Sequence, residues 1–156
     1  MSNQHHYKTT IEWTGNKGSG TSAYTAYERS HTIRTENKAD IAASSDKNYR
    51  GDATKHNPED LFLSSLASCH MLWYLHLCAD NKIIVESYTD EASGTMTTEA
   101  NGSGRFTEVV LAPAITIQNA DKTDLAYQLH HKAHEMCFLA NSVNFDIVIQ
   151  PKIKAQ

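Results

Sequence analysis

The chain has 156 residues, of which 40% are hydrophobic and 21% are charged, with 3 cysteines and a net charge of −4. These proportions are typical of one ordinary globular domain, and they exclude a disordered chain and a disulfide-stabilised scaffold. A domain of this length buries about 70% of its unfolded surface, so it needs neither a metal nor a disulfide to fold. We therefore expect an important cysteine in this chain to have a chemical role rather than a role in stability.

The 14 basic and 18 acidic residues are spread along the chain without a long cluster of lysines and arginines. The sequence predicts no nucleic-acid partner, since phosphate neutralisation needs a concentrated positive surface. The first six residues have no apolar stretch, and the uncharged segment 61–79 contains serines and histidines, so we expect neither secretion nor a membrane span. With an odd number of cysteines, we expect reduced thiols and a cytoplasmic protein.

The first third of the chain is predicted to form strands. β-Branched and aromatic residues between 7 and 35 favour a small antiparallel sheet, with the glycine-rich segment 15–20 as a turn. That segment fits no nucleotide-binding motif, and no cofactor is expected. Residues 36–56 are polar without a usable period, which predicts a long loop of the kind that often carries function.

A helix is predicted from Pro58 to about Asn81. Asn57 precedes it as a cap, Pro58 takes the first helical position, and two acidic residues follow at the positive end of the helix dipole. No charged residue occurs between Leu61 and Ala79, and apolar side chains lie on all sides. Such a helix should be buried nearly all round, either at the centre of the domain or inside an oligomer.

The remaining residues predict a strand pair, a helix and a strand. Residues 83–118 are predicted to form a long hairpin around a turn at 101–104. Residues 121–141 are predicted to form a second helix, and residues 143–150 a last half-buried strand. Two helices combined with antiparallel strands define an α+β fold, and the chain 1–156 is predicted to be a single domain.

The three cysteines are the first candidates for chemistry. Cys69 and Cys78 are nine residues apart on the predicted helix, about 13 Å along its axis, which is too far for a disulfide. Cys137 falls on the second helix, and packed helices allow facing cysteines to meet. The geometry therefore leaves two intrachain pairs, Cys137 with Cys69 or with Cys78. The alternative is that all three are small buried core residues.

The segment around Cys69 resembles a known family. The Asn57-Pro58-Glu59 start, the ten-residue step from Glu59 to Cys69 and the order of elements are similar to the OsmC/Ohr family of osmotically inducible and organic hydroperoxide resistance proteins. Cys137 stands where that family carries its partner cysteine. The residues that follow the two cysteines differ from those of many members, so the resemblance is to a branch distinct from the two best-known ones.

The resemblance implies an OsmC-like fold, in which antiparallel sheets pack around two long helices in an intertwined homodimer. It also implies a thiol-dependent peroxidase that reduces organic hydroperoxides in oxidative stress defence. Cys69 would be the reactive cysteine and Cys137 the resolving cysteine. An external dithiol, such as a lipoylated protein, would return both thiols to the reduced state.

The family also uses an arginine to support the thiolate and a glutamate, matched here by Glu59, to hold that arginine. Arg50 is our candidate for the arginine, with Arg29 and Arg34 as alternatives. On one straight helix Glu59 and Cys69 would be about 15 Å apart. A bridging group, a bend in the helix or the second subunit must therefore connect them.

Two other functions remain open from the sequence. A non-catalytic redox sensor or a small apolar-ligand binder could keep the same fold and both cysteines.

The histidines are the other candidates for chemistry. His130 and His134 have a spacing compatible with a transition metal, but no further ligand pattern follows, so no metal site is expected. His70 is predicted to be a packed core histidine, with tuning of Cys69 as the alternative.

Overall fold

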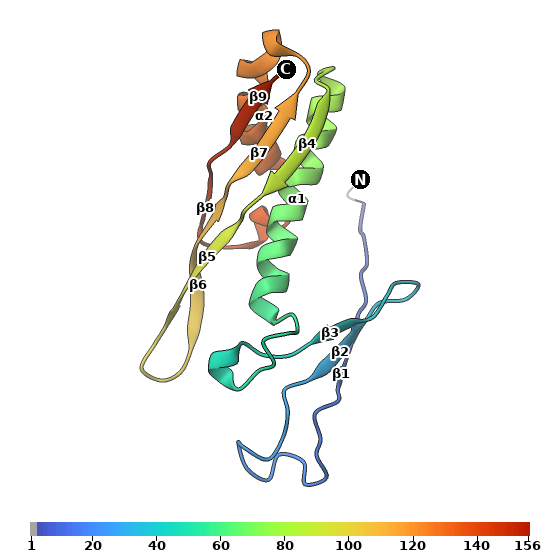
Figure 1. Cartoon of the computed structure of the whole chain (residues 1–156), viewed down its shortest axis with the longest axis vertical. Helices are drawn as coiled ribbons and strands as arrows, with labels where there is room; N and C mark the ends of the chain where they lie inside the picture. Colours follow the sequence, from blue (N-terminus) through green and yellow to red (C-terminus); the bar gives the residue numbers. More distant parts are fainter. Residues whose placement is uncertain (1–2) are drawn as a thin grey trace. The chain divides into compact units, whose positions relative to one another are not determined.

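The computed structural model describes residues 3–156 (Figure 1). These residues fall into two compact units, one ending at Leu61 and the other spanning Phe62–Gln156. The predicted α+β fold with antiparallel-rich sheets and two helices is confirmed.

The first unit holds a three-stranded antiparallel sheet of order β1-β2-β3. Its register places Ile33 opposite Ile11 on one side and Ile41 on the other. The sheet was predicted, but its strands are shorter than expected and β3 lies inside the predicted loop 36–56. A short 3-10 turn, η1, follows the sheet at Lys47–Tyr49. The strand bounds are β1 Thr10–Trp13, β2 His31–Arg34 and β3 Ile41–Ala43.

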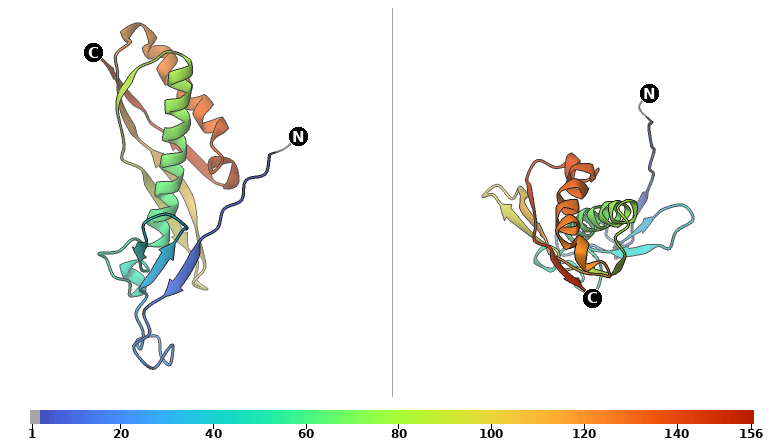
Figure 2. Two further views of the ribbon diagram at one scale, coloured as in Figure 1. Left: turned by 90° about the vertical axis from the view of Figure 1, so that its right-hand side faces the viewer. Right: turned by 90° about the horizontal axis from the view of Figure 1, so that it is seen from above.

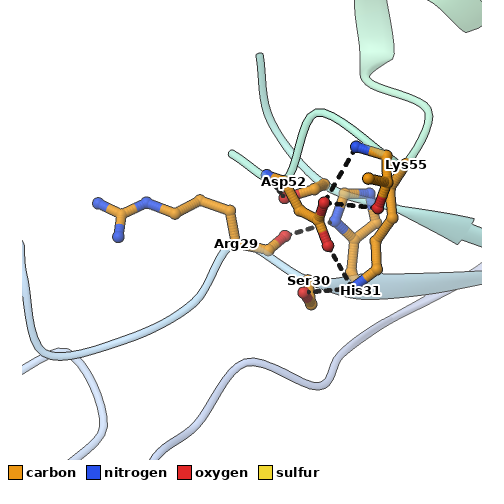
Figure 3. Close-up of polar contacts among 7 residues, drawn as sticks. Arg29, Ser30, His31, Asp52 and Lys55 are labelled. Atoms are coloured by element: carbon orange, nitrogen blue, oxygen red, sulfur yellow. Dashed lines mark hydrogen bonds and ion pairs between the residues drawn. The ribbon is translucent and has the colours of Figure 1, made fainter. Parts of the chain in front are cut away.

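Polar contacts tie the long loop to the start of β2 (Figure 3). The Lys55 ammonium donates a hydrogen bond to Ser30 Oγ at 2.8 Å and forms an ion pair with Asp52 at 3.3 Å. His31 Nδ1–H donates to the carbonyl oxygen of Arg29 at 3.0 Å. Lys55 therefore ties the end of the predicted loop to the segment just before β2.

Helix α1 (Pro58–Asp80) begins where the sequence predicts. Asn57 Oδ1 accepts a hydrogen bond from the Asp60 amide at 2.7 Å, as an N-cap does. Within this chain the helix is not buried all round, since Leu72 is 62% exposed. Only one stripe at four-residue spacing is fully buried: Leu66, His70, Tyr74 and Cys78.

The second unit contains two three-stranded sheets, β4-β7-β9 and β5-β6-β8. In each sheet one pair of strands is antiparallel (β4 with β7, β5 with β6) and one is parallel (β7 with β9, β6 with β8). The strand bounds are β4 Val85–Asp90, β5 Ser93–Thr98, β6 Gly104–Leu111, β7 Pro113–Ile117, β8 Asp146–Ile149 and β9 Lys152–Ala155.

The predicted hairpin 83–118 has its turn in the expected place, but each of its arms is divided between the two sheets. The division falls between β4 and β5 and again at Ala112, whose amide donates to the Asp90 carboxylate at 2.7 Å. A side chain thus takes the backbone donor at the point where the chain leaves one sheet for the other. Pro113, which has no amide proton, then starts β7.

Helices α1 and α2 (Thr123–Met136) pack against the same sheet, β4-β7-β9, and lie behind it in Figure 1. Figure 2 shows the two helices beside each other. The first half of α1 packs instead on sheet β5-β6-β8, where Leu66 meets Val109 and Leu111. By length and composition α1 is the one helix among residues 3–156 that could cross a membrane. Because its buried stripe packs on two sheets of its own chain, we interpret it as a core helix.

The predicted second helix, 121–141, is too long at its C-terminal end. The helix stops at Met136, Cys137 is extended (φ −69°, ψ 112°), and a 3-10 turn, η3, follows at Ala140–Ser142. The side-chain amide of Asn141 donates to the carbonyl of Glu135 at 3.0 Å, which supplies a partner for a helix-end carbonyl. Cys137 therefore lies just beyond α2 rather than on it.

The predicted last strand, 143–150, contains β8, whereas β9, which follows it, is not predicted from the sequence. In the sequence Pro151 indicates the end of a strand. In the structure it lies between β8, which belongs to one sheet, and β9, which belongs to the other.

Candidate active site

Cys69 lies near the middle of α1 and is partly exposed. Beside it is a cavity of about 350 Å³, which we call the Cys69 hollow. This volume is within the range of small-ligand sites. Its lining is mainly apolar and aromatic and consists of Cys69, Leu72, Trp73, His76 and Phe138.

Cys137 is only 1% exposed. Burial raises the pKa of its thiol to about 11, and a side-chain hydrogen bond with Cys69 adds to the increase. The Cys137 sulfur also accepts a hydrogen bond from the Ala140 amide at 3.4 Å, which holds it in the turn after α2. Cys137 is therefore a neutral thiol at physiological pH, and it lies against the more exposed Cys69.

The structure brings Cys69 and Cys137 together and leaves Cys78 elsewhere. All three are free thiols. Cys78 is 1% exposed and belongs to the core cluster with Tyr74, and burial raises its pKa. Of the two pairs that helix geometry allowed, only the pair of Cys69 and Cys137 is in contact.

Arg29, one of the three arginines considered for the thiolate, is already engaged inside the first unit. Its guanidinium donates to the carbonyls of Tyr27 at 2.7 Å and Tyr24 at 2.8 Å. It also lies 4.2 and 4.3 Å from the centroids of their rings, which is cation–π geometry. Figure 3 shows the Arg29 side chain pointing away from Asp52 and Lys55.

Arg34 is engaged as well, through ion pairs with Glu12 and with Asp40, the latter at 3.1 Å. Hydrogen bonding and charge from Glu12 raise the pKa of Arg34 further. Two carboxylates therefore neutralise this guanidinium on an exposed surface.

Arg50 and Glu59 also lie in the first unit. Arg50 is exposed and ends the η1 turn with a left-handed backbone (φ 64°), while Glu59 is half-buried in the first turn of α1. Neither side chain makes a hydrogen bond or an ion pair with the described residues 3–156. Both are thus available for a partner that this unit does not supply.

A histidine pair that the sequence did not predict lies in the core of the second unit. His70 and His130 are 1% and 3% exposed, and His70 Nε2 is 3.0 Å from His130 Nδ1. Burial lowers the pKa of His70 to about 4, with a contribution from His134, and that of His130 to about 3, with a contribution from His70. Both rings are therefore neutral at pH 7, and one proton occupies the contact between them.

The prediction of a core position for His70 is confirmed, since it continues the buried stripe of α1. The sequence offered one signal for its partner: His130 shares a face of α2 with the buried Ala126 and Ala133. The four-residue spacing of His130 and His134 is by itself also compatible with a pair of metal ligands. No group of three or more His, Cys, Asp or Glu side chains in the described part of the chain could hold a metal ion.

An α+β unit whose central helix presents a partly exposed cysteine to a second, buried cysteine has the geometry of a dithiol site. Residues 51–152 match the family model described as OsmC-like protein, and the chain belongs to that family. No match was found among the curated proteins.

Solved structures agree with this assignment. An OsmC-like protein of unknown function from Vibrio cholerae is 31% identical with a TM-score of 0.86, and the match covers 96% of this chain and all of that one. An organic hydroperoxide resistance protein from Elizabethkingia anophelis has the same fold at 18% identity and a TM-score of 0.70, with both chains fully covered. A V. cholerae protein described as an organic hydroperoxide resistance protein, with captopril in one active site, is 25% identical with a TM-score of 0.68 over 98% of this chain and 94% of that one.

Proposed function

We propose that this protein is a thiol peroxidase that reduces organic hydroperoxides. One observation carries the proposal: a partly exposed Cys69 borders an apolar hollow and has a neutral Cys137 thiol against it. Membership of the OsmC-like family and structural relatives described as organic hydroperoxide resistance proteins support the same activity.

The first step is attack by the Cys69 thiolate on one peroxide oxygen. A sulfur–oxygen bond forms, the oxygen–oxygen bond breaks, and the leaving alkoxide takes up a proton to become an alcohol. Sulfur is oxidised and the peroxide is reduced, which leaves Cys69 as a sulfenic acid. The apolar lining of the Cys69 hollow suits the organic part of the peroxide.

The second step joins the two cysteines. The Cys137 sulfur attacks the sulfenic sulfur, a disulfide forms, and the sulfur–oxygen bond breaks. The proton that Cys137 retained leaves with the hydroxide as water. An external dithiol then reduces the disulfide by thiol–disulfide exchange and is itself oxidised. A lipoylated protein in the cytoplasm is the reductant we propose.

We assign support of the thiolate to Arg50, held by Glu59. The residues that line the Cys69 hollow include no lysine and no arginine, so we look for the supporting charge among the arginines of the first unit. Arg29 and Arg34 are already paired with carbonyls and carboxylates, whereas Arg50 has no such partner among the described residues. A planar guanidinium also suits an anion and a peroxide oxygen at once.

A second copy of the chain is part of this proposal. Leu72 and Phe138, both of which line the Cys69 hollow, are 62% and 67% exposed. Large apolar side chains gathered at one exposed site are typical of an interaction surface. We propose that a homodimer covers this face of α1, and its mass in solution, measured by light scattering, tests that.

The activity is tested with reduced protein and cumene hydroperoxide. We expect peroxide to be consumed in the presence of a dithiol and the Cys69→Ser variant to lose this turnover. If the wild-type thiols react but turnover is absent, the protein is a redox sensor. Binding of an apolar probe by a protein with unreactive thiols would instead identify a ligand binder and refute the peroxidase.

A further inference from the structure

The histidine pair links the same two chain segments that carry the cysteines. His70 follows Cys69 directly on α1, and His130 lies on α2 seven residues before Cys137, about two helical turns away. The hydrogen bond between His70 Nε2 and His130 Nδ1, at 3.0 Å, therefore joins the two helices close to the reacting sulfurs.

This contact restricts how the helices can move in a way that apolar packing does not. Hydrophobic attraction is non-directional and depends on the area buried rather than on the alignment of particular atoms. A hydrogen bond weakens steeply outside a narrow range of distance and angle. Here a shift of α1 along α2 would leave His70 Nε2 and His130 Nδ1 buried without a partner, which is costly in a low-dielectric core.

The orientation of the rings is fixed as well. The ring of Tyr74 stacks on that of His130, with 3.9 Å between centroids and 13° between planes. His70 lies on the same stripe of α1 as Tyr74, one turn earlier, and its ring is within 13° of parallel to that of His130. Rotation of the His130 ring away from His70 is therefore blocked by a fully buried aromatic side chain.

We propose that His70 and His130 form a positioning pair, which holds α1 against α2 at the spacing where the sulfurs of Cys69 and Cys137 meet and so sets the rate of disulfide closure. This inference rests on the proposed function, because it concerns the second step of that cycle. Sulfur atoms must approach within bonding distance with a defined dihedral angle, so a small displacement of one helix slows closure.

The pair should act on the second step and leave the first unchanged. Attack on the peroxide requires Cys69 and the substrate, whereas closure requires Cys137 to be in place. When closure slows, the sulfenic acid of Cys69 persists and a second peroxide oxidises it to the sulfinic acid. Loss of the pair should therefore convert a recycling enzyme into one that inactivates itself during turnover.

Four variants separate this role from general stability. His130→Leu and His70→Met each remove the hydrogen bond while keeping an apolar side chain. His130→Asn keeps a polar atom at the position of Nδ1, and His70→Gln keeps one at the position of Nε2. The matched control is Leu129→Ala, which weakens the core beside His130 without touching the pair, since Leu129 is 7% exposed.

The test follows the species formed after one addition of cumene hydroperoxide to reduced protein. Dimedone labelling and intact mass distinguish sulfenic acid, disulfide and sulfinic acid. For His130→Leu and His70→Met we expect sulfenic acid to form within about twofold of the wild-type rate and the disulfide to close about tenfold more slowly, with sulfinic acid accumulating. His130→Asn and His70→Gln should recover most of the closure rate, and Leu129→Ala should close normally.

A parallel oxidation with diamide separates failure of this inference from failure of the proposed function. Diamide oxidises a dithiol to a disulfide without peroxidase activity. A wild-type protein that closes its disulfide with diamide but ignores the hydroperoxide refutes the peroxidase and leaves the pair testable by diamide alone. Closure at the wild-type rate in His130→Leu and His70→Met, or an equal delay in Leu129→Ala, overturns the positioning pair.

Discussion

Cys137 lies against Cys69 and is the buried partner of the two, and its burial and the neighbouring Cys69 thiol both raise its pKa. Its pKa of about 11 means that it carries its proton throughout the physiological range. Cys137 is therefore not the nucleophile that begins a cycle, and its proton is available when a hydroxide has to leave Cys69. This asymmetry orders the two cysteines without reference to any relative.

The cysteine variants should separate into three behaviours. Cys69→Ser should abolish turnover, because it removes the attacking sulfur. Cys137→Ser should complete a single attack and then stop with a sulfenic acid at Cys69, detected by dimedone. Cys78→Ala should turn over normally and lose about 1 to 2 kcal/mol of unfolding free energy, since its buried sulfur only fills the core. Loss of turnover in Cys78→Ala at unchanged folding would contradict the assignment.

The arginine assignment is tested by thiol reactivity. Arg50→Met should lower the iodoacetamide alkylation rate of Cys69 at pH 7 by about tenfold, because the reactive thiolate loses a neighbouring positive charge. Arg34→Met is the control, because Arg34 is paired with Glu12 and Asp40 and should leave that rate unchanged. If the Arg34 variant loses reactivity and the Arg50 variant does not, the roles are reversed.

The lining of the Cys69 hollow should determine the preference for organic peroxides. Leu72→Ser removes apolar surface from the cavity, so we expect KM for cumene hydroperoxide to rise several-fold while the rate with hydrogen peroxide stays the same, in protein that light scattering shows to have kept the wild-type mass. Steady-state kinetics with both peroxides measure this. Equal losses with the two substrates would show that Leu72 supports the site in some way other than contact with the organic group.

Burial of the histidine pair makes stability depend on pH. In the unfolded chain both rings have a pKa near 6.5, whereas in the folded chain the pKa of His70 is about 4 and that of His130 about 3. Below pH 6.5 the unfolded state therefore binds more protons than the folded state, and stability falls as pH decreases toward 4. Between pH 6 and pH 5 the two rings should together remove roughly 2 kcal/mol.

Urea unfolding at pH 7, 6 and 5 measures this loss. His130→Asn should show a smaller decrease with pH than the wild type, because one of the two depressed groups is gone. His131→Gln is the matched control: His131 is the next residue on α2, but its side chain is 81% exposed and pairs with Glu135 at the surface. An identical decrease in all three proteins would assign the acid sensitivity to other groups.

Local signals in the sequence were sufficient for much of the fold. The cap at Asn57 and the run of uncharged residues gave α1 its start and length, and the alternation from Val143 onward gave β8. The sequence could not place β9, because Pro151 looks the same whether a strand ends or the chain moves to another sheet. Nor could it show that Asp90 takes the amide of Ala112 where the hairpin divides, since that contact joins residues 22 positions apart.

The site was predictable only in part. Helix geometry left Cys69 and Cys78 as equal partners for Cys137, and the tertiary packing brings Cys69 into contact with it. His70 and His130 are 60 residues apart, and each alone looks like an ordinary core or surface histidine. The role of Arg50 is a prediction that the Arg50→Met variant tests, and the role of Glu59 in holding that arginine stays a prediction.

The central claim is that Cys69 and Cys137 form one redox-active pair, and peptide mapping after oxidation tests it most directly. Reduced protein receives one equivalent of cumene hydroperoxide, and the alcohol released, the intact mass and the non-reduced peptides are measured. We predict one alcohol per chain, a mass loss of about 2 Da and a single peptide pair linked through Cys69 and Cys137. Unreacted thiols, or a disulfide that contains Cys78, would contradict the account.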